Sequence, residues 1–134
     1  MIASTRERVR DNTPRHINER IEFETARNVA YYATQDDAAV EKRLAELDEE
    51  WDIDRMLEAH TAGIAIGGFL LGAVMNRKWF VLPGLAGAFL LQYALAGWCP
   101  QLPVLRHLGF RTAEEIAEER CALLEARKQP AKPK

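Results

Sequence analysis

Two apolar stretches stand back to back in the middle of the chain, Thr61–Met75 and Trp79–Trp98. Only the tripeptide Asn76–Lys78 separates them, and it carries all of the charge between Thr61 and Trp98. A helix of about 20 mostly apolar residues crosses the core of a bilayer. The pattern therefore predicts an all-α protein built around a two-span transmembrane helical hairpin, residues 56–98.

The second stretch has the length of a membrane span, and Trp79 and Trp98 stand at its ends as in an aromatic belt. The first stretch is shorter, so we expect its helix to begin near Met56 and to be capped by Asp52 or Asp54. The alternative is a buried hairpin in a soluble bundle. Helices of that kind usually carry a charged face, and neither stretch has one.

Small residues recur at a spacing of four within both stretches. This spacing lets the backbones of membrane helices approach closely. The predicted helix-packing residues are Gly63, Gly67, Gly68, Gly72, Gly84 and Ala88. Packing within the hairpin and docking on another membrane protein both suit the pattern, so the partner stays open.

Charge near the ends of the stretches predicts an orientation. A hairpin places both termini on one side, and cationic flanks favour the cytoplasm. The flanks on the side of the termini contain Lys42, Arg43, Arg55, Arg106 and Arg111, whereas the connecting loop contains Arg77 and Lys78. We therefore expect cytoplasmic N- and C-termini. No signal-peptide pattern precedes the first stretch, so the stretches themselves are expected to direct insertion.

Outside the hairpin the charge is uneven. Residues 1–60 carry nine Lys and Arg against fifteen Asp and Glu, and residues 99–134 carry seven against five. Nucleic-acid binding is not expected, because acidic residues balance the Arg-rich start of the chain. Two cysteines do not form a disulfide framework.

Residues 1–55 predict amphipathic helices, one of them strongly acidic. Thr13-Pro14 is typical of a helix start, and the stripe expected to be buried in that helix is Phe23, Ala26, Ala30 and Ala33. A second helix is expected from Asp37, with a candidate interaction face at Val40, Leu44, Leu47 and Trp51. We expect this face to pack on the neighbouring helix, on the hairpin or on another protein, and the sequence leaves these alternatives open. The opposite face is acidic, so we expect it to stand off the lipid or to meet a basic partner.

Residues 99–128 predict an interfacial segment followed by a last helix. Pro100 and Pro103 keep the start of the segment irregular. Thr112 and Glu115 have the spacing of a capping box, which opens a helix over Ala113–Lys128. Its apolar residues are Ile116, Ala117, Leu123 and Leu124. Residues 129–134 contain two prolines and two lysines, a composition that predicts a disordered tail.

Three short motifs carry a family resemblance over Asp48–Lys128: Trp51–Arg55, Gly97–Pro100 and Leu108–Thr112. This region resembles a bacterial family of small inner-membrane proteins of unknown function. Its helix pair is similar to the two-helix membrane domain of YgaP-type membrane-anchored rhodaneses. The resemblance implies an inner-membrane hairpin with cytoplasmic ends and implies no activity. Nothing in Met1–Glu50 resembles a rhodanese domain, because this segment is short, has no strand-like alternation and contains no cysteine.

One side of the hairpin gathers the residues best suited to chemistry. His60 lies at the start of the first span, Cys99 follows the second, and His107 comes after it. Thiolate and imidazole ligands suit zinc or another soft metal, and paired histidines suit haem. The spacing contains no Cys-x-x-Cys and no His-x-x-x-His, so no metal or cofactor is predicted. Arg106 and His107 could give Cys99 the electropositive setting that a reactive thiol needs, whereas the C-terminal end of a helix disfavours a thiolate there.

Two functions follow from these patterns. The first is a non-catalytic inner-membrane protein, a scaffold or accessory subunit that contacts the lipid bilayer and another membrane protein or a second copy of itself. The second is a thiol- or metal-dependent membrane protein that acts through Cys99 and handles sulfur or redox chemistry. Phosphate loops, catalytic triads and paired carboxylates in a cleft are absent from the sequence, so neither an enzyme nor a small-molecule substrate is predicted.

Overall fold

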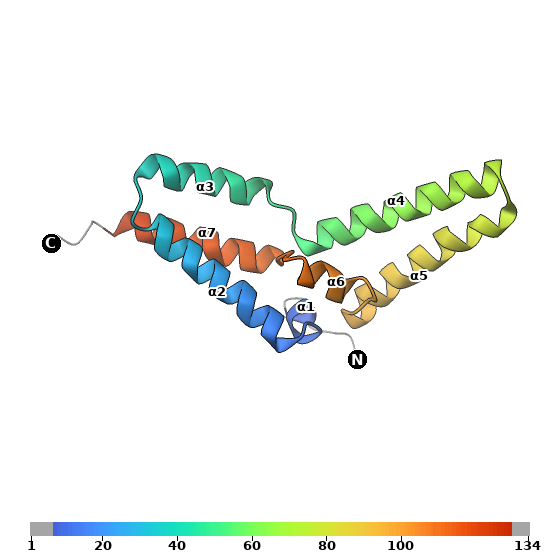
Figure 1. Cartoon of the computed structure of the whole chain (residues 1–134), viewed down its shortest axis with the longest axis horizontal. Coiled ribbons are helices and arrows are strands. Elements are labelled where there is room, and N and C mark those ends of the chain that lie inside the picture. The colour runs from blue at the N-terminus through green and yellow to red at the C-terminus, as the bar shows by residue number, and fades with distance from the viewer. Residues whose placement is uncertain (1–6, 130–134) are drawn as a thin grey trace.

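The computed structural model describes residues 7–129, and this part of the chain is entirely helical (Figure 1). The predicted tail lies outside this range except for Gln129. The elements in chain order are α1 Arg8–Asp11, α2 Arg15–Tyr32, α3 Asp37–Glu49, α4 Ile53–Val74, the short 3₁₀ helix η1 Arg77–Phe80, α5 Val81–Ala96, α6 Leu102–His107 and α7 Ala113–Lys128. The prediction of an all-α fold is confirmed.

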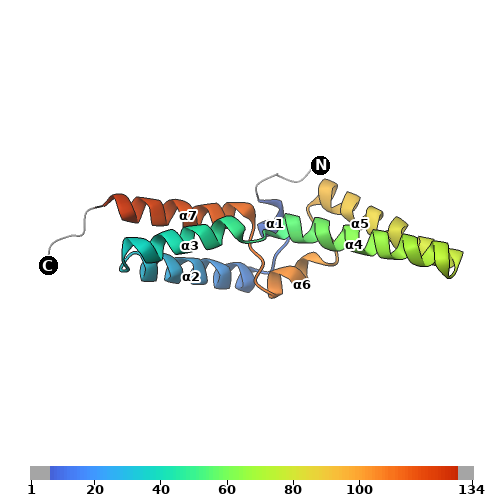
Figure 2. The same cartoon turned by 90° about the horizontal axis from the view of Figure 1, so that it is seen from above.

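The described chain is elongated and has two parts. Helices α2, α3 and α7 form a bundle at one end, and α4 and α5 form a hairpin that projects from the other end (Figures 1 and 2). The short helices α1 and α6 lie where the two parts meet. Because α1 lies where the two parts meet and α7 belongs to the bundle, both ends of the described chain lie away from the tip of the hairpin.

Helix α4 starts where the sequence places a cap. The Asp52 side chain accepts a hydrogen bond of 2.7 Å from the backbone N–H of Arg55, and the helix runs from Ile53 past His60 as expected. Asn76 opens η1 by accepting a hydrogen bond from the N–H of Lys78. Helix α5 ends at Gly97, whose φ of 72° is left-handed and favours glycine. By length and composition, α4 and the joined η1 and α5 are long and apolar enough to cross a membrane.

The small residues of the hairpin fall into two groups. A Cβ added at Gly68 would lie 2.6 Å from Leu82 Cβ, and one at Gly72 would lie 2.9 Å from the ring of Phe80. These two glycines therefore permit the close approach of α4 to η1 and α5. Added Cβ atoms at Gly63, Gly67 and Gly84 would meet nothing within 4 Å, and Ala88 is exposed. Among residues 7–129, nothing therefore packs closely against the hairpin at these four positions.

The bundle has its own apolar core. Val40 and Leu47 of α3 meet Ile116 and Leu123 of α7, and Tyr32 and Leu44 pack against this cluster. The face of α3 expected as an interaction surface is therefore covered by the chain itself, which corrects that expectation for Val40, Leu44 and Leu47. The reason is that α7 supplies a matching apolar stripe. Trp51 alone of the four is exposed, with 43% of its surface accessible, and the Arg55 guanidinium stacks 4.5 Å from its ring centre.

The stripe predicted for α2 is wrong. Phe23 is 67% exposed, and Ala26, Ala30 and Ala33 are exposed as well. Ile17 and Ile21 are buried instead, and the same side of the helix continues through partly buried positions at Thr25, Asn28 and Tyr32. The true inner face contains polar residues because it meets charged side chains of the junction. Apolar periodicity therefore indicates the face of Ala26, Ala30 and Ala33, although the opposite, more polar face is the buried one.

The segment after α5 is more ordered than the sequence suggests. The start at Cys99 and Pro100 is irregular as expected, but α6 follows, with Pro103 in its first turn, where a missing N–H costs nothing. Gly109 then turns the chain with a φ of 96°. The capping box of Thr112 and Glu115 is present, and α7 spans Ala113–Lys128 as predicted.

Candidate functional site

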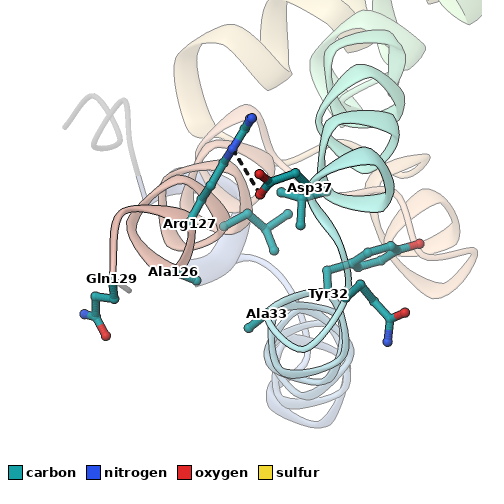
Figure 3. A pocket seen from close by; sticks show the side chains of 9 residues that line it. Tyr32, Ala33, Asp37, Ala126, Arg127 and Gln129 are labelled. Carbon is teal, nitrogen blue, oxygen red and sulfur yellow. Dashed lines mark ion pairs between the residues drawn. The ribbon is translucent and has the colours of Figure 1, made fainter. Parts of the chain in front are cut away.

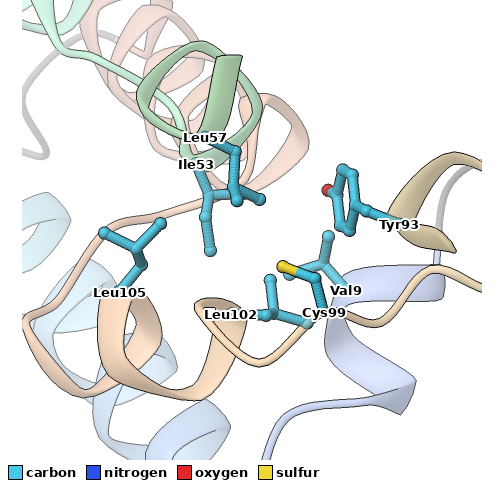
Figure 4. Packing of buried hydrophobic residues seen from close by; sticks show 7 residues of the cluster. All are labelled: Val9, Ile53, Leu57, Tyr93, Cys99, Leu102 and Leu105. Atoms are coloured by element: carbon cyan, nitrogen blue, oxygen red, sulfur yellow. The ribbon is translucent and has the colours of Figure 1, made fainter. Parts of the chain in front are cut away.

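The junction between the bundle and the hairpin contains Cys99, one of the residues that the sequence singled out for chemistry. Its apolar cluster joins α1, the start of α4, the end of α5 and α6. The members are Val9, Ile53, Leu57, Tyr93, Cys99, Leu102 and Leu105 (Figure 4). Residues from α1, from both ends of the hairpin and from α6 meet at this cluster, which therefore fixes the base of the hairpin.

Cys99 lies inside this cluster and is 1% exposed. Figure 4 places its sulfur among Val9, Leu102 and the side chains of α4 and α5. A reactive cysteine needs a partly exposed, electropositive setting. Cys99 has the setting of a small apolar core residue instead. The exposed cysteine of the described chain is Cys121 on α7.

The two histidines expected beside Cys99 lie elsewhere. His60 is exposed, and its Nδ1 lies 3.3 Å from Oε1 of Gln101. His107 is exposed on the far side of α6, where it lines a shallow groove with His16 and Val104. Within residues 7–129 no three His, Cys, Asp or Glu side chains are grouped so that they could hold a metal ion. The structure therefore does not bring His60, Cys99 and His107 together.

Arg106 is the central polar residue of the junction and is fully buried. Its Nη1 and Nη2 donate to the two carboxylate oxygens of Glu115 at 2.7 and 2.9 Å, a bidentate pair. Its Nε donates to Thr13 Oγ1 at 3.1 Å, and the remaining N–H groups reach Asn18 Oδ1 and the Phe110 carbonyl. All five donors of the guanidinium are thus engaged. Arg106 ties α6 to α2 and α7 and does not face Cys99.

A second buried network lies beside it. Arg111 donates to both oxygens of Glu50 and to Glu119, and its Nη1 also reaches Thr25 Oγ1 at 3.3 Å. Glu119 is fully buried and accepts a further bond of 2.9 Å from Arg43 Nε. This network joins α2, α3 and α7. The backbone adds a link to the hairpin, because the N–H of Ile53 donates to the Arg111 carbonyl at 2.9 Å.

These contacts set the charge states of the two glutamates. Burial by itself would raise the pKa of Glu115, but the hydrogen bonds from Arg106 and from the Thr112 backbone outweigh burial, and the pKa is lowered. Burial likewise opposes ionisation of Glu119, and hydrogen bonds from Arg43 and Arg111 again lower its pKa below the ordinary value. Both carboxylates are therefore ionised at neutral pH. Their role is structural, because every partner is a group of the same chain.

The acidic face of α3 finds basic partners inside the chain. Asp48 pairs with Arg120 of α7, and Arg127 near the end of α7 pairs with Asp37 and Glu41. The expectation of a basic partner is met by α7 rather than by another molecule. Such exposed pairs contribute little stability individually, and the apolar cluster between α3 and α7 holds the two helices together.

A pocket of about 270 Å³ opens at the far end of the bundle, between the ends of α2, α3 and α7 (Figure 3). Asp37 and Arg127 pair across it at 3.5 Å, beside Tyr32 and Leu123. Its charged groups satisfy each other, and its lining contains neither a nucleophile nor a second carboxylate. The pocket therefore offers no arrangement for catalysis.

Sequence reasoning missed the arginine networks. It used Arg106 and Arg111 as flanking charges, Arg106 also as a cation near Cys99, and Glu115 as a cap. One signal was present: Glu115, Glu119 and Leu123 follow at intervals of four, so two acids lie on the buried stripe of α7. Acids on an apolar stripe indicate buried ion pairs, but their partners lie far away in the sequence.

A comparison of the chain with protein families, with curated proteins and with solved structures found no match.

Proposed function

We propose that this chain is a non-catalytic inner-membrane protein whose hairpin anchors a rigid cytoplasmic helical bundle. In this role it is a scaffold or an accessory subunit of a larger membrane assembly. The proposal includes the relationship of Asp48–Lys128 to the membrane domain of YgaP-type rhodaneses, without their sulfurtransferase activity.

The uncovered apolar surface of the hairpin is the observation that carries the proposal. Only 22% of the most apolar window in the first candidate span is buried, and 11% in the second. The core helices of soluble proteins are mostly buried, and soluble monomers rarely expose large continuous apolar patches. The hairpin differs from such proteins in both respects. The exposed side chains include Ile66, Phe69, Leu70, Val74, Leu91 and Leu95. Lipid is the environment that suits such a surface.

The arrangement of the chain supports cytoplasmic termini. The bundle that contains α2 and α7 lies at one end, and Arg77 and Lys78 lie at the tip of the hairpin. The base is flanked by Arg55, Arg106 and Arg111, which outnumber the cations of the tip. The positive-inside rule then favours a cytoplasmic base.

A partner within the membrane is the second part of the proposal. Gly63 and Gly67 on α4 and Gly84 and Ala88 on α5 leave space that no described residue fills. Small residues at this spacing are typical of helix–helix contacts in lipid. We favour a second copy or another membrane protein as the occupant.

Two measurements test the proposed function. The protein should stay in the membrane pellet after carbonate extraction, and its native mass in a gentle detergent should exceed that of one chain. A soluble protein would contradict the anchor, and a stable lone monomer would contradict the association. The rival function through Cys99 has no supporting observation, because the thiol is buried and its expected histidine neighbours lie apart.

A further inference from the structure

A groove of about 330 Å³ lies between the first turns of α4 and the last turns of α5, at the base of the hairpin. It is lined by Arg8, Asp54, Leu57, Glu58, Leu90, Tyr93 and Ala94. The α5 side of the groove is apolar except for the Tyr93 hydroxyl, and α1 and α4 contribute one cation and two carboxylates. If the hairpin crosses a membrane, this groove opens at the level where phospholipid headgroups meet the hydrocarbon core.

Asp54 is already satisfied within the groove. Its Oδ1 accepts hydrogen bonds from the Tyr93 hydroxyl and, at 3.4 Å, from Arg8 Nη2. The Arg8 guanidinium also stacks on Tyr93, 4.8 Å from the ring centre. These contacts hold Arg8, Asp54 and Tyr93 in one fixed arrangement.

Arg8 keeps hydrogen-bonding capacity after these contacts. A guanidinium has five N–H donors, and among residues 7–129 the Arg8 side chain directs them to Asp54, through one long hydrogen bond, and to the Tyr93 hydroxyl, which leaves further N–H groups for a ligand. Guanidinium groups bind phosphate oxygens well because two parallel N–H donors match their geometry. Arg8 thus presents a fixed phosphate-binding edge to the groove.

Glu58 contributes a negative charge to the same groove. It is exposed, and its carboxylate makes no hydrogen bond or ion pair with any residue from 7 to 129. It lies one helical turn beyond Asp54 on α4, and helical side chains lean toward the helix N-terminus, which brings the carboxylate back toward the level of Asp54. An ionised carboxylate at the edge of the hydrocarbon core is costly without a cationic partner.

A cation with spare hydrogen-bond donors and an anion without a partner among residues 7–129 fit a zwitterionic amphiphile in a groove that also has apolar lining. We propose that the groove binds the phosphoethanolamine headgroup of a phospholipid, with the ammonium on Glu58 and the phosphate on Arg8. Leu90 and Ala94 then contact the glycerol and the first carbons of the acyl chains. This inference rests on the proposed membrane location of the hairpin.

Headgroup chemistry separates this ligand from the other common lipids. The ammonium of phosphoethanolamine donates three hydrogen bonds to carboxylates, whereas the trimethylammonium of phosphocholine donates none. Phosphoglycerol carries no cation, so Glu58 would repel it. The groove should therefore select phosphatidylethanolamine over both.

The test is native mass spectrometry of the full chain in gentle detergent with each of three lipids of matched acyl chains. Phosphatidylethanolamine should be retained about tenfold more than phosphatidylcholine or phosphatidylglycerol, as expected when a charge-assisted hydrogen bond is added. Glu58→Gln should remove this preference. Glu49→Gln is the matched control, since Glu49 is an exposed glutamate of α3, and it should leave the preference unchanged. Glu58→Lys should shift retention toward phosphatidylglycerol.

Equal retention of the three lipids, or a preference that survives Glu58→Gln, would overturn the inference. Soluble phosphoethanolamine should compete with the lipid only weakly, because it lacks the acyl contacts. Equally strong binding of the soluble headgroup would contradict the assignment to a lipid. Membrane pelleting, measured in parallel, separates the two claims: a protein that pellets but does not select lipids contradicts this inference alone.

Discussion

At the scale of single residues, Arg106 has the largest number of partners in the junction. It is fully buried with all five donors engaged, and it links α6 to α2 and α7. Arg106→Ala would leave the Glu115 carboxylate buried without its partner. Breaking a buried pair in this way costs about 3–5 kcal/mol. We expect a large fall in melting temperature by circular dichroism, whereas Arg15→Ala, which breaks an exposed pair with Glu19, should change nothing measurable.

The two buried glutamates predict a dependence of stability on pH. Their pKa values are lowered in the folded protein, so the unfolded chain binds protons more readily in acid. Their contribution is fully present above the ordinary value of 4.5 and is lost as the pH falls through the lowered values. Thermal melts between pH 7 and pH 3 should show a steep loss of stability below 4.5.

A double variant serves as the control for this dependence. Glu115→Gln with Glu119→Gln removes both titrating groups and should flatten the profile below pH 4.5, at a lower stability throughout. An unchanged acid slope in this variant would assign the loss of stability to other carboxylates.

The two cysteines should differ sharply in reactivity. Cys99 is packed in the junction cluster, and Cys121 is exposed on α7. In the folded protein a maleimide should label Cys121 rapidly and Cys99 only after denaturation, as intact mass would record. Fast labelling of Cys99 in the native state would support the thiol-dependent function instead.

At the scale of elements, the contact between α4 and α5 depends on Gly68. An added methyl group there would lie 2.6 Å from Leu82 Cβ and 2.7 Å from Pro83 Cδ, neither of which is the far end of a flexible side chain. Gly68→Ala should therefore splay the hairpin and destabilise it by about 1–3 kcal/mol, as overpacking does. Gly87→Ala is the matched control within the hairpin, because its methyl group would meet nothing within 4 Å and Gly87 is not among the proposed packing residues. Thermal unfolding in detergent should separate the two variants, and equal melting temperatures would contradict the close packing.

Local signals predicted several elements well. Asp52 caps α4, α3 begins at Asp37, and the Thr112–Glu115 box opens α7, because these signals depend on residues close together in the chain. Helix α6 was not predicted, because two prolines in a short segment are typical of irregular structure. The packing of Leu102 and Leu105 in the junction cluster stabilises this helix, and no local pattern shows that packing. The inner face of α2 was assigned wrongly, because its partners are polar.

The candidate site was less predictable for a physical reason. The sequence places His60, Cys99 and His107 near one end of the hairpin, but it does not say which way a side chain points. Cys99 faces the cluster of α1, α4 and α6, whereas His107 faces outward from α6. The pairing of Arg106 with Glu115 likewise depends on how α6 and α7 pack, which no local pattern specifies.

At the scale of the whole molecule, the bundle and the hairpin are joined by a buried, fully hydrogen-bonded junction. No buried side-chain polar atom in the described part of the chain lacks a partner. Well-satisfied buried networks favour one fixed arrangement over many. A hairpin in the membrane would therefore hold the bundle at a defined orientation, which suits a scaffold better than a flexible tether.

Site-directed labelling across the membrane tests the central claim most directly. In spheroplasts a membrane-impermeant maleimide should label Lys78→Cys at the tip of the hairpin, tested in a Cys121→Ser background. It should label the native Cys121 of the bundle only after the membrane is permeabilised. Labelling of Cys121 without permeabilisation, or protection of position 78 until permeabilisation, would contradict a membrane-crossing hairpin with a cytoplasmic bundle.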